Sequence, residues 1–235
     1  SEAEDKMDSL YSRGIAPGAL HTDNRLDFPC GGKECPYMRK WRGILDADIL
    51  IGHPTHAYET GVVEDRIVVI DEGVGGAFET KFPSKKWRRA IGEYLSYQDD
   101  IPVNSITDIL NLRKGRHIGN QENVASTVRS VEQSDLYGHL IDSNRGHVNT
   151  LYALWALVEP ISVESGEPPY KIELQNGIEF AELTENTVAV FDPESGIITV
   201  RRTPDFEMAT SLVGLDGTPT KSMWSGRLGI DNLEI

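Results

Sequence analysis

The chain has 235 residues, of which 39% are hydrophobic and 26% charged, enough for one large domain or two small ones with a buried core. This composition excludes collagen-like and wholly disordered chains, and the length excludes a small disulfide-stapled scaffold. The longest apolar stretch, residues 151–158, is shorter than the roughly 18 residues that a membrane span needs. No basic-then-apolar signal opens the chain, so we expect a soluble cytoplasmic protein.

The charge balance is strongly acidic, with 37 Asp and Glu against 23 Lys and Arg and a net charge of −14. Such a chain normally disfavours nucleic acid, because phosphates bind cationic groups. At molar salt, however, the Debye length is about 3 Å, and an acidic surface no longer repels a polyanion at a distance. With 14 Arg and nine Lys, the composition is typical of halophilic archaea and predicts a protein of such an organism or its virus. An ordinary acidic protein is the alternative.

The first third of the chain predicts a short helix, a loop and two strands. Residues 1–14 suit a helix that ends at a glycine, and residues 15–35 suit an irregular loop that ends at the cysteines. Residues 47–52 and 66–71 are nearly continuous apolar runs, as in central strands of a parallel sheet covered on both faces. Polar or glycine-bearing sequence follows each run, where such sheets place their functional groups.

The middle of the chain predicts a helical insertion, because apolar residues recur at helical intervals over residues 84–164. A linker follows, and then three short strands at 171–174, 187–191 and 197–201, the last two joined as a hairpin. Residues 211–216 predict another buried strand before a short helix. We therefore expect an α/β fold with a mostly parallel sheet, divided into three segments. These are a portion that contains the first strands (1–83), a helical insertion (84–165) and a return to the sheet (166–235).

The sequence Ile67-Val-Val-Ile-Asp71-Glu72 carries the clearest chemical signal. Four β-branched residues predict a strand, and two carboxylates follow at its carboxyl end. In nucleoside triphosphatases the first acid of such a pair holds Mg²⁺ and the second polarises the attacking water. Many buried strands also end in an acid that only caps the next element, which is the structural alternative.

Three segments together resemble superfamily 2 DNA helicases of the iron–sulfur XPD/DinG type: Cys35-Pro36-Tyr37, residues 47–53 and residues 66–72. In that family Cys-Pro-Tyr closes the cluster loop, and the Walker B strand ends in Asp-Glu-Ala-His. The resemblance implies that the mostly parallel sheet is RecA-like, part of a first motor domain, and that residues 84–165 form an arch-like helical insertion. It also implies that Asp71 binds Mg²⁺, that Glu72 orients water and that His53 contacts nucleic acid. Here Val74 stands where the family has its final His, which links ATP hydrolysis to DNA contact.

A second match lies at residues 213–220, which resemble the family's motif III. The resemblance implies that Asp216, Gly217, Thr218 and Thr220 couple the nucleotide state to the neighbouring domain. The alternative is a plain strand-to-helix turn, with Thr218 as the N-cap and Pro219 at the first helical position.

Cys30 and Cys35 could supply two ligands of a [4Fe–4S] cluster or of a zinc ion, either of which normally requires four. These are the chain's two cysteines, so the remaining cluster ligands would lie on sequence outside it. Alternatively, His21 and another residue complete a zinc site, or the two cysteines are a remnant or form a disulfide.

One dense basic run contains Lys81 and four residues proposed to contact nucleic acid: Lys85, Lys86, Arg88 and Arg89. A solvated helix face is the other interpretation of such a run.

No G-x-x-x-x-G-K-[ST] phosphate-binding loop occurs in the sequence. We therefore expect a fragment or truncated relative of an ATP-dependent DNA helicase or translocase, inactive as an isolated ATPase. It would use Mg²⁺ and ATP, and its partners would be DNA and the missing helicase portions or a partner subunit. The alternatives are a non-catalytic nucleic-acid- or partner-binding protein of this fold and a metal-dependent nuclease. The helicase interpretation requires that the strands ending at Asp71 and Asp216 are neighbours with their carboxyl ends on one side.

Overall fold

The computed structural model describes residues 2–15, 17–22, 26, 35–36, 39, 41–44, 46–71, 76–114, 118–131, 140, 146–162, 168–184, 186–217, 220–230 and 234. The fold is mixed α and β, which confirms the expected class in its coarse form. Its parallel sheet has two described strands, in the order β1-β7, and its larger sheet has five, in the order β2-β6-β5-β4-β3. A mostly parallel sheet is therefore not confirmed.

Chain contacts divide the protein into two compact units. Unit 1 comprises Ser1–Cys35 and Lys81–Val200, and unit 2 comprises Pro36–Thr80 and Arg201–Ile235. This division differs from the expected segments 1–83, 84–165 and 166–235 in two main respects. Residues 1–35 group with the helices of unit 1 rather than with the segment that carries β1. The strands between 170 and 200 group with the helices rather than with the parallel strands, because they share one hydrophobic core with them.

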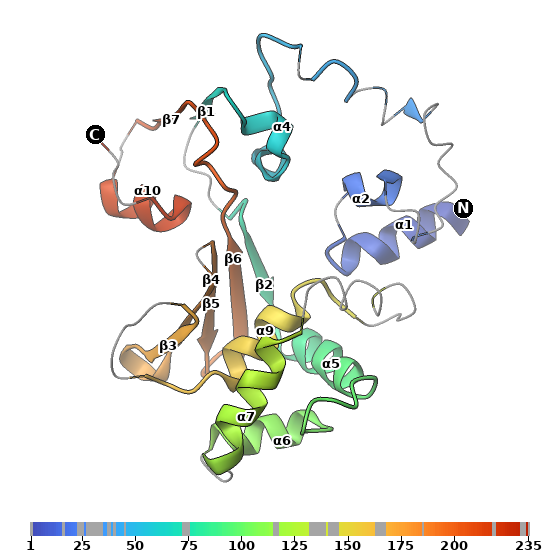
Figure 1. The fold of residues 1–235 in the computed structure, drawn as a ribbon, viewed down its shortest axis with the longest axis vertical. Coiled ribbons are helices and arrows are strands. Elements are labelled where there is room, and N and C mark those ends of the chain that lie inside the picture. Colours follow the sequence, from blue (N-terminus) through green and yellow to red (C-terminus); the bar gives the residue numbers. More distant parts are fainter. Residues whose placement is uncertain are drawn as a thin grey trace. The chain divides into compact units, whose positions relative to one another are not determined.

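The helices of unit 1 are mostly short and amphipathic. They are α1 (Glu2–Ser12), α2 (Pro17–Thr22), α5 (Ser84–Leu95), α6 (Ile106–Arg113), α7 (Ile118–Arg129) and α9 (Thr150–Val158). Helix α9, whose residues are nearly all buried, lies between the sheet and helices α5, α6 and α7 (Figure 1). Helices are thus observed in the region between residues 84 and 158 for which the sequence predicts them.

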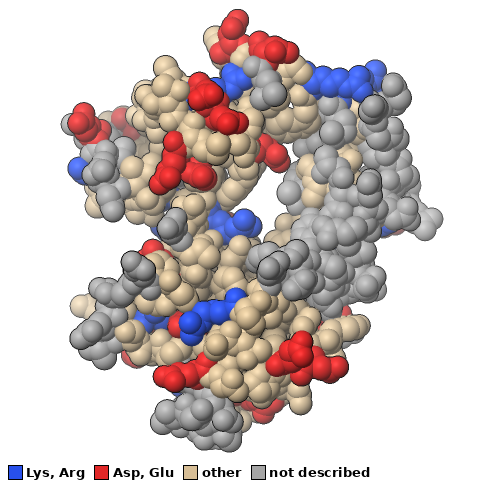
Figure 2. Space-filling model, viewed as in Figure 1, with Lys and Arg blue, Asp and Glu red and all other residues tan. Residues whose placement is uncertain are grey.

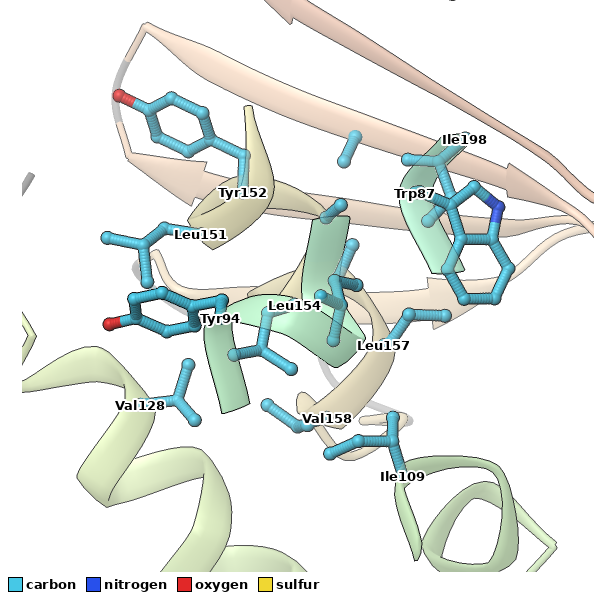
Figure 3. Packing of buried hydrophobic residues seen from close by; sticks show 14 of the residues in the cluster. Trp87, Tyr94, Ile109, Val128, Leu151, Tyr152, Leu154, Leu157, Val158 and Ile198 are labelled. Atoms are coloured by element: carbon cyan, nitrogen blue, oxygen red, sulfur yellow. The ribbon is translucent and has the colours of Figure 1, made fainter. Parts of the chain in front are cut away.

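The core of unit 1 forms where α9 meets α5 and the sheet. Figure 3 shows Trp87 and Tyr94 of α5 packed around Leu154 and Leu157 of α9, with Ile198 of β6 above them. The indole Nε1 of Trp87 also donates a hydrogen bond to the carbonyl oxygen of Gly196 at 2.9 Å. The indole is fully buried, so the bond satisfies a group that would otherwise lose its hydration.

The larger sheet consists of β2 (Glu79–Phe82), β3 (Tyr170–Glu173), β4 (Glu179–Thr184), β5 (Thr187–Asp192) and β6 (Ile197–Arg202). Pairings β3–β4 and β4–β5 are antiparallel. The sequence predicts β3, β5, β6 and the hairpin between the last two, but not β2 or β4. Buried Lys171 of β3 forms an ion pair with Glu179 of β4 at 2.6 Å, and Arg113 of α6 also pairs with Glu179.

Unit 2 contains β1 (Ile67–Asp71), β7 (Ser211–Leu215), α4 (Thr60–Val63), α10 (Lys221–Leu228) and a 3₁₀ turn, η3 (Pro54–Tyr58). The strand predicted at residues 47–52 is wrong, since this segment has no strand structure. Ile49 and Ile51 are 80% and 97% exposed. None of the helices described in either unit has the length and apolarity to cross a membrane.

Candidate functional site

The candidate site lies at the carboxyl ends of two parallel strands in unit 2. Strand β1 pairs with β7 in parallel, and Asp71 is in register with Leu215, the residue before Asp216. The expectation that these two strands are neighbours ending on the same side is confirmed. The carboxylates of Asp71 and Asp216, some 145 positions apart in the chain, therefore lie at the same edge of the sheet. The carboxyl ends of parallel strands are where α/β sheets bind their ligands.

One face of this strand pair packs against α10. Ile70 is buried and Val68 partly buried in a cluster that includes Trp224 and Leu228 of α10. Gly214 of β7 lies against the indole of Trp224, so closely that a Cβ at this position would be 2.9 Å from the ring's Cζ3 atom. A glycine is needed here because the helix approaches the strand more closely than any side chain allows.

The same tryptophan orients one acid of the site. The Trp224 Nε1 donates a hydrogen bond to the Oδ2 atom of Asp216 at 3.3 Å, and Asp216 is half-buried. Asp71 is exposed. One carboxylate is thus held by the helix while the other faces solvent.

The opposite face of the strand pair is apolar and exposed. Ile67, Val69, Val213 and Leu215 are 65%, 55%, 40% and 49% exposed. The expectation that both strands are buried on both faces is wrong for the described chain, in which the pairing of β1 and β7 forms a two-stranded sheet.

The turn after β7 is partly described. Gly217 and Thr220 are exposed, and Thr220 is the N-cap residue of α10 without a side-chain capping bond. The alternative with Thr218 as N-cap is therefore wrong by two residues. Glu72 and Thr218, which the resemblance assigns to water activation and coupling, lie outside the described residues, and so does Cys30.

The structure shows His53 in a helix-capping role and gives no contact between it and Asp71 or Asp216. His53 is the N-cap residue of η3, and its Nδ1 accepts a hydrogen bond from the backbone N–H of Thr55 at 3.3 Å. The ring is exposed, so it remains open to a ligand.

Arg66, which the sequence interpretation missed, fixes the chain before β1. Its Nη1 and Nη2 atoms donate to the carbonyl oxygens of Ala47 and Ile44, both at 2.6 Å. The sequence signal that could have revealed this anchor is that Arg66 is the one basic residue in the run 66–71, which predicts strand β1. Arg66 anchors Ile44 and Ala47 beside the start of the strand that carries Asp71.

In unit 1, Cys35 is buried and its Sγ lies 3.4 Å from Nδ1 of His21. His21 is the residue named in the zinc alternative, so two of its expected ligands are adjacent. Two cysteines supply at most two of the four thiolates of a [4Fe–4S] cluster, so this chain alone does not complete such a site. Within the described ranges, no group of three His, Cys, Asp or Glu side chains is placed to hold a metal ion.

The four basic residues proposed to contact nucleic acid lie on α5, and all are exposed. Lys86 lies over the ring of Phe82, with Nζ 6.0 Å from the ring centroid. Although the residue as a whole is exposed, its amine is partly desolvated, which lowers the pKa of that amine. Arg88 covers Trp87 at 4.7 Å and donates from Nε to the Ser84 hydroxyl at 2.9 Å. The first turns of α5 thus combine cations that are held in place with others that point to solvent.

Comparison with known proteins gives no relative: no protein-family model, no curated protein and no solved structure matches this chain.

Proposed function

We propose that this chain forms part of the first motor domain of an ATP-dependent DNA helicase or translocase of the XPD/DinG type. The observation that carries the proposal is the parallel pairing of β1 with β7, which brings the ends carrying Asp71 and Asp216 together. In this proposal the paired ends belong to a RecA-like sheet.

The chemistry of the edge agrees with a magnesium–nucleotide site. Magnesium prefers carboxylate oxygens and keeps several waters, so one or two acids suffice on the protein side. Asp71 is exposed and would take the metal, and Asp216 is held by Trp224 beside the next turn. When bound, Mg²⁺ would neutralise the charge that develops on the transferred phosphoryl group.

The exposed apolar face favours the idea that the motor is completed by other protein. Contiguous apolar surface of this kind marks interaction sites in soluble proteins. The missing helicase portions or a partner subunit would cover Ile67, Val69, Val213 and Leu215. The same face equally favours the second candidate, a non-catalytic partner-binding protein of this fold.

Paramagnetic broadening by Mn²⁺, used in place of Mg²⁺, tests the metal site in the chain itself. In molar KCl with ADP present, we expect Mn²⁺ to broaden the amide signals of Asp71, Asp216 and Gly217 first. Asp71→Asn should abolish this localised effect. Asp205→Asn is the matched control, because Asp205 is another exposed acid of unit 2 whose Oδ1 accepts the backbone N–H of Glu207 at 2.9 Å.

Broadening that is spread evenly or centred elsewhere would contradict the proposal. In that case salt-resistant binding of single-stranded DNA by the same sample would select the non-catalytic candidate. Cleavage of DNA with Mn²⁺ and no nucleotide would instead select the nuclease alternative. The isolated chain, without a phosphate-binding loop, should turn over Mg·ATP very slowly.

A further inference from the structure

Helix α5 has two faces of opposite character. Its apolar face is buried in the core of unit 1 and carries Trp87, Ala90, Ile91, Tyr94 and Leu95. The opposite face carries Lys85, Arg88, Arg89, Gly92 and Ser96, which follow one another at helical spacing. The chain as a whole is acidic, and Figure 2 shows Asp and Glu scattered over the visible surface. A cationic helix face is therefore a local exception.

This face borders an open depression with a volume of about 570 Å³. It is lined by Arg88, Arg89, Gly92, Glu93, Ser96 and Tyr97. The depression is open to solvent rather than enclosed, and its lining is more polar than apolar.

Gly92 occupies the middle of this lining without a packing reason. A Cβ at Gly92 would meet nothing within 4 Å, so no neighbouring group requires a glycine there. Glycine inside a helix is less favourable than alanine. The residue thus weakens α5, and the space beside it, within the depression, is open.

The charges of the depression favour an anion. The guanidinium of Arg88 is held by Trp87 and Ser84, which pre-organises it, and Arg89 has no ion pair within the described chain. The lining contains one acid, Glu93, whose Oε2 atom is buried, so two guanidinium groups stand against one carboxylate. Guanidinium groups bind phosphate oxygens in a bidentate manner.

Tyr97 adds an exposed aromatic ring to the cationic groups that line the depression. Its side chain is 61% exposed at the end of α5, although most large apolar residues of unit 1 are buried. Exposed aromatic rings beside cationic groups bind nucleotides by stacking on the base, and this stacking is independent of sequence.

We propose that this depression binds a nucleotide unit, with its phosphate at Arg88 and Arg89 and its base stacked on Tyr97. The unit belongs either to a free mononucleotide or to a single strand, since both present the same chemistry. The site lies in unit 1, whereas the paired acids lie in unit 2, so this inference does not depend on the proposed motor function.

Titrations of the whole chain with fluorescent single-stranded dT₁₂, with AMP and with inorganic phosphate test the proposal and separate the sources. We expect nucleotide binding at low salt that Arg89→Gln and Tyr97→Ala each weaken about tenfold. Equal affinity per site for AMP and dT₁₂ would identify a free nucleotide, and much tighter dT₁₂ would identify a strand. Inorganic phosphate should bind far more weakly than either ligand.

A glycine pair provides the matched control. Gly92→Leu fills the depression and should abolish binding while raising thermal stability. Gly226→Leu changes another helix glycine whose Cβ would also meet nothing within 4 Å, and it should leave binding unchanged. Absence of binding to dT₁₂ and AMP, or an unaltered affinity in Gly92→Leu, would overturn the proposal.

Discussion

Replacing Gly214 with alanine tests the close contact between β7 and α10 on which the candidate site depends. The new methyl group would lie 2.9, 3.0 and 3.2 Å from three carbon atoms of the Trp224 ring, whereas carbon atoms pack favourably at 3.5–4.0 Å. Trp224 is 3% exposed and cannot move without disturbing the cluster around Ile70. Such overpacking costs about 1–3 kcal/mol, partly offset by about 0.4–1 kcal/mol from the stiffer unfolded chain. We expect a net loss of about 1–2 kcal/mol.

Hydrogen exchange of peptides that cover residues 67–71 and 211–215 measures this loss directly, as protection lowered about five- to thirtyfold. Gly217→Ala is the matched control, because a Cβ at Gly217 would meet nothing within 4 Å, and it should leave protection unchanged or raise it slightly. Trp224→Phe keeps a ring but removes the indole N–H, and so tests the bond to Asp216 separately. Protection in Gly214→Ala equal to that of the unaltered chain would refute the reasoning.

Three further predictions concern charged and polar groups. Burial lowers the pKa of Lys171 to about 8, so the unfolded chain holds the extra proton above that pH. The free energy of unfolding should therefore rise between about pH 8 and 10.5, by at most about 1.4 kcal/mol per pH unit. Urea midpoints measured over this range should rise for the unaltered chain and not for Lys171→Met. Parallel pH profiles of the two proteins would contradict the prediction. Burial likewise lowers the pKa of His147 to about 3, so the free energy of unfolding should fall as the pH drops from about 6.5. In urea titrations the stability of His147→Gln should fall less steeply over this range, and an equally steep fall would contradict this cause. Arg66→Ala removes two charged hydrogen bonds to the carbonyl oxygens of Ala47 and Ile44, each worth about 1.5–3 kcal/mol; amide exchange over residues 46–49 should rise at least tenfold, and an unchanged rate would show that the anchor is dispensable.

The sequence predicted those elements whose signal is local. Strand β1 and the β5–β6 hairpin were predicted correctly, because β-branched runs and a turn-forming sequence specify them without distant partners. The parallel pairing of β1 with β7 was predicted from the resemblance. Hydrophobic pattern alone does not predict this pairing, because about 145 residues separate the two strands in the chain.

Other elements depend on partners that the sequence does not reveal. Strand β4 was missed because its two glutamates give it a polar appearance, although Glu179 is neutralised by Lys171 and Arg113 from other elements. Residues 47–52 have the pattern of a buried strand, but a pattern supplies no neighbour, and Ile51 is 97% exposed. The depression beside Gly92 was also not predicted, because the sequence does not show whether the space beside a helix glycine is filled or open.

Disulfide trapping between β1 and β7 tests the central claim most directly. In parallel register Val69 lies opposite Val213, and both side chains are on the exposed face, so oxidation of Val69→Cys/Val213→Cys should give a linked peptide pair detectable by mass spectrometry. Ile67→Cys/Leu215→Cys would be opposite one another in an antiparallel arrangement and should stay unlinked. Rapid linkage of this second pair, or none of the first, would contradict the parallel arrangement and with it the paired acids.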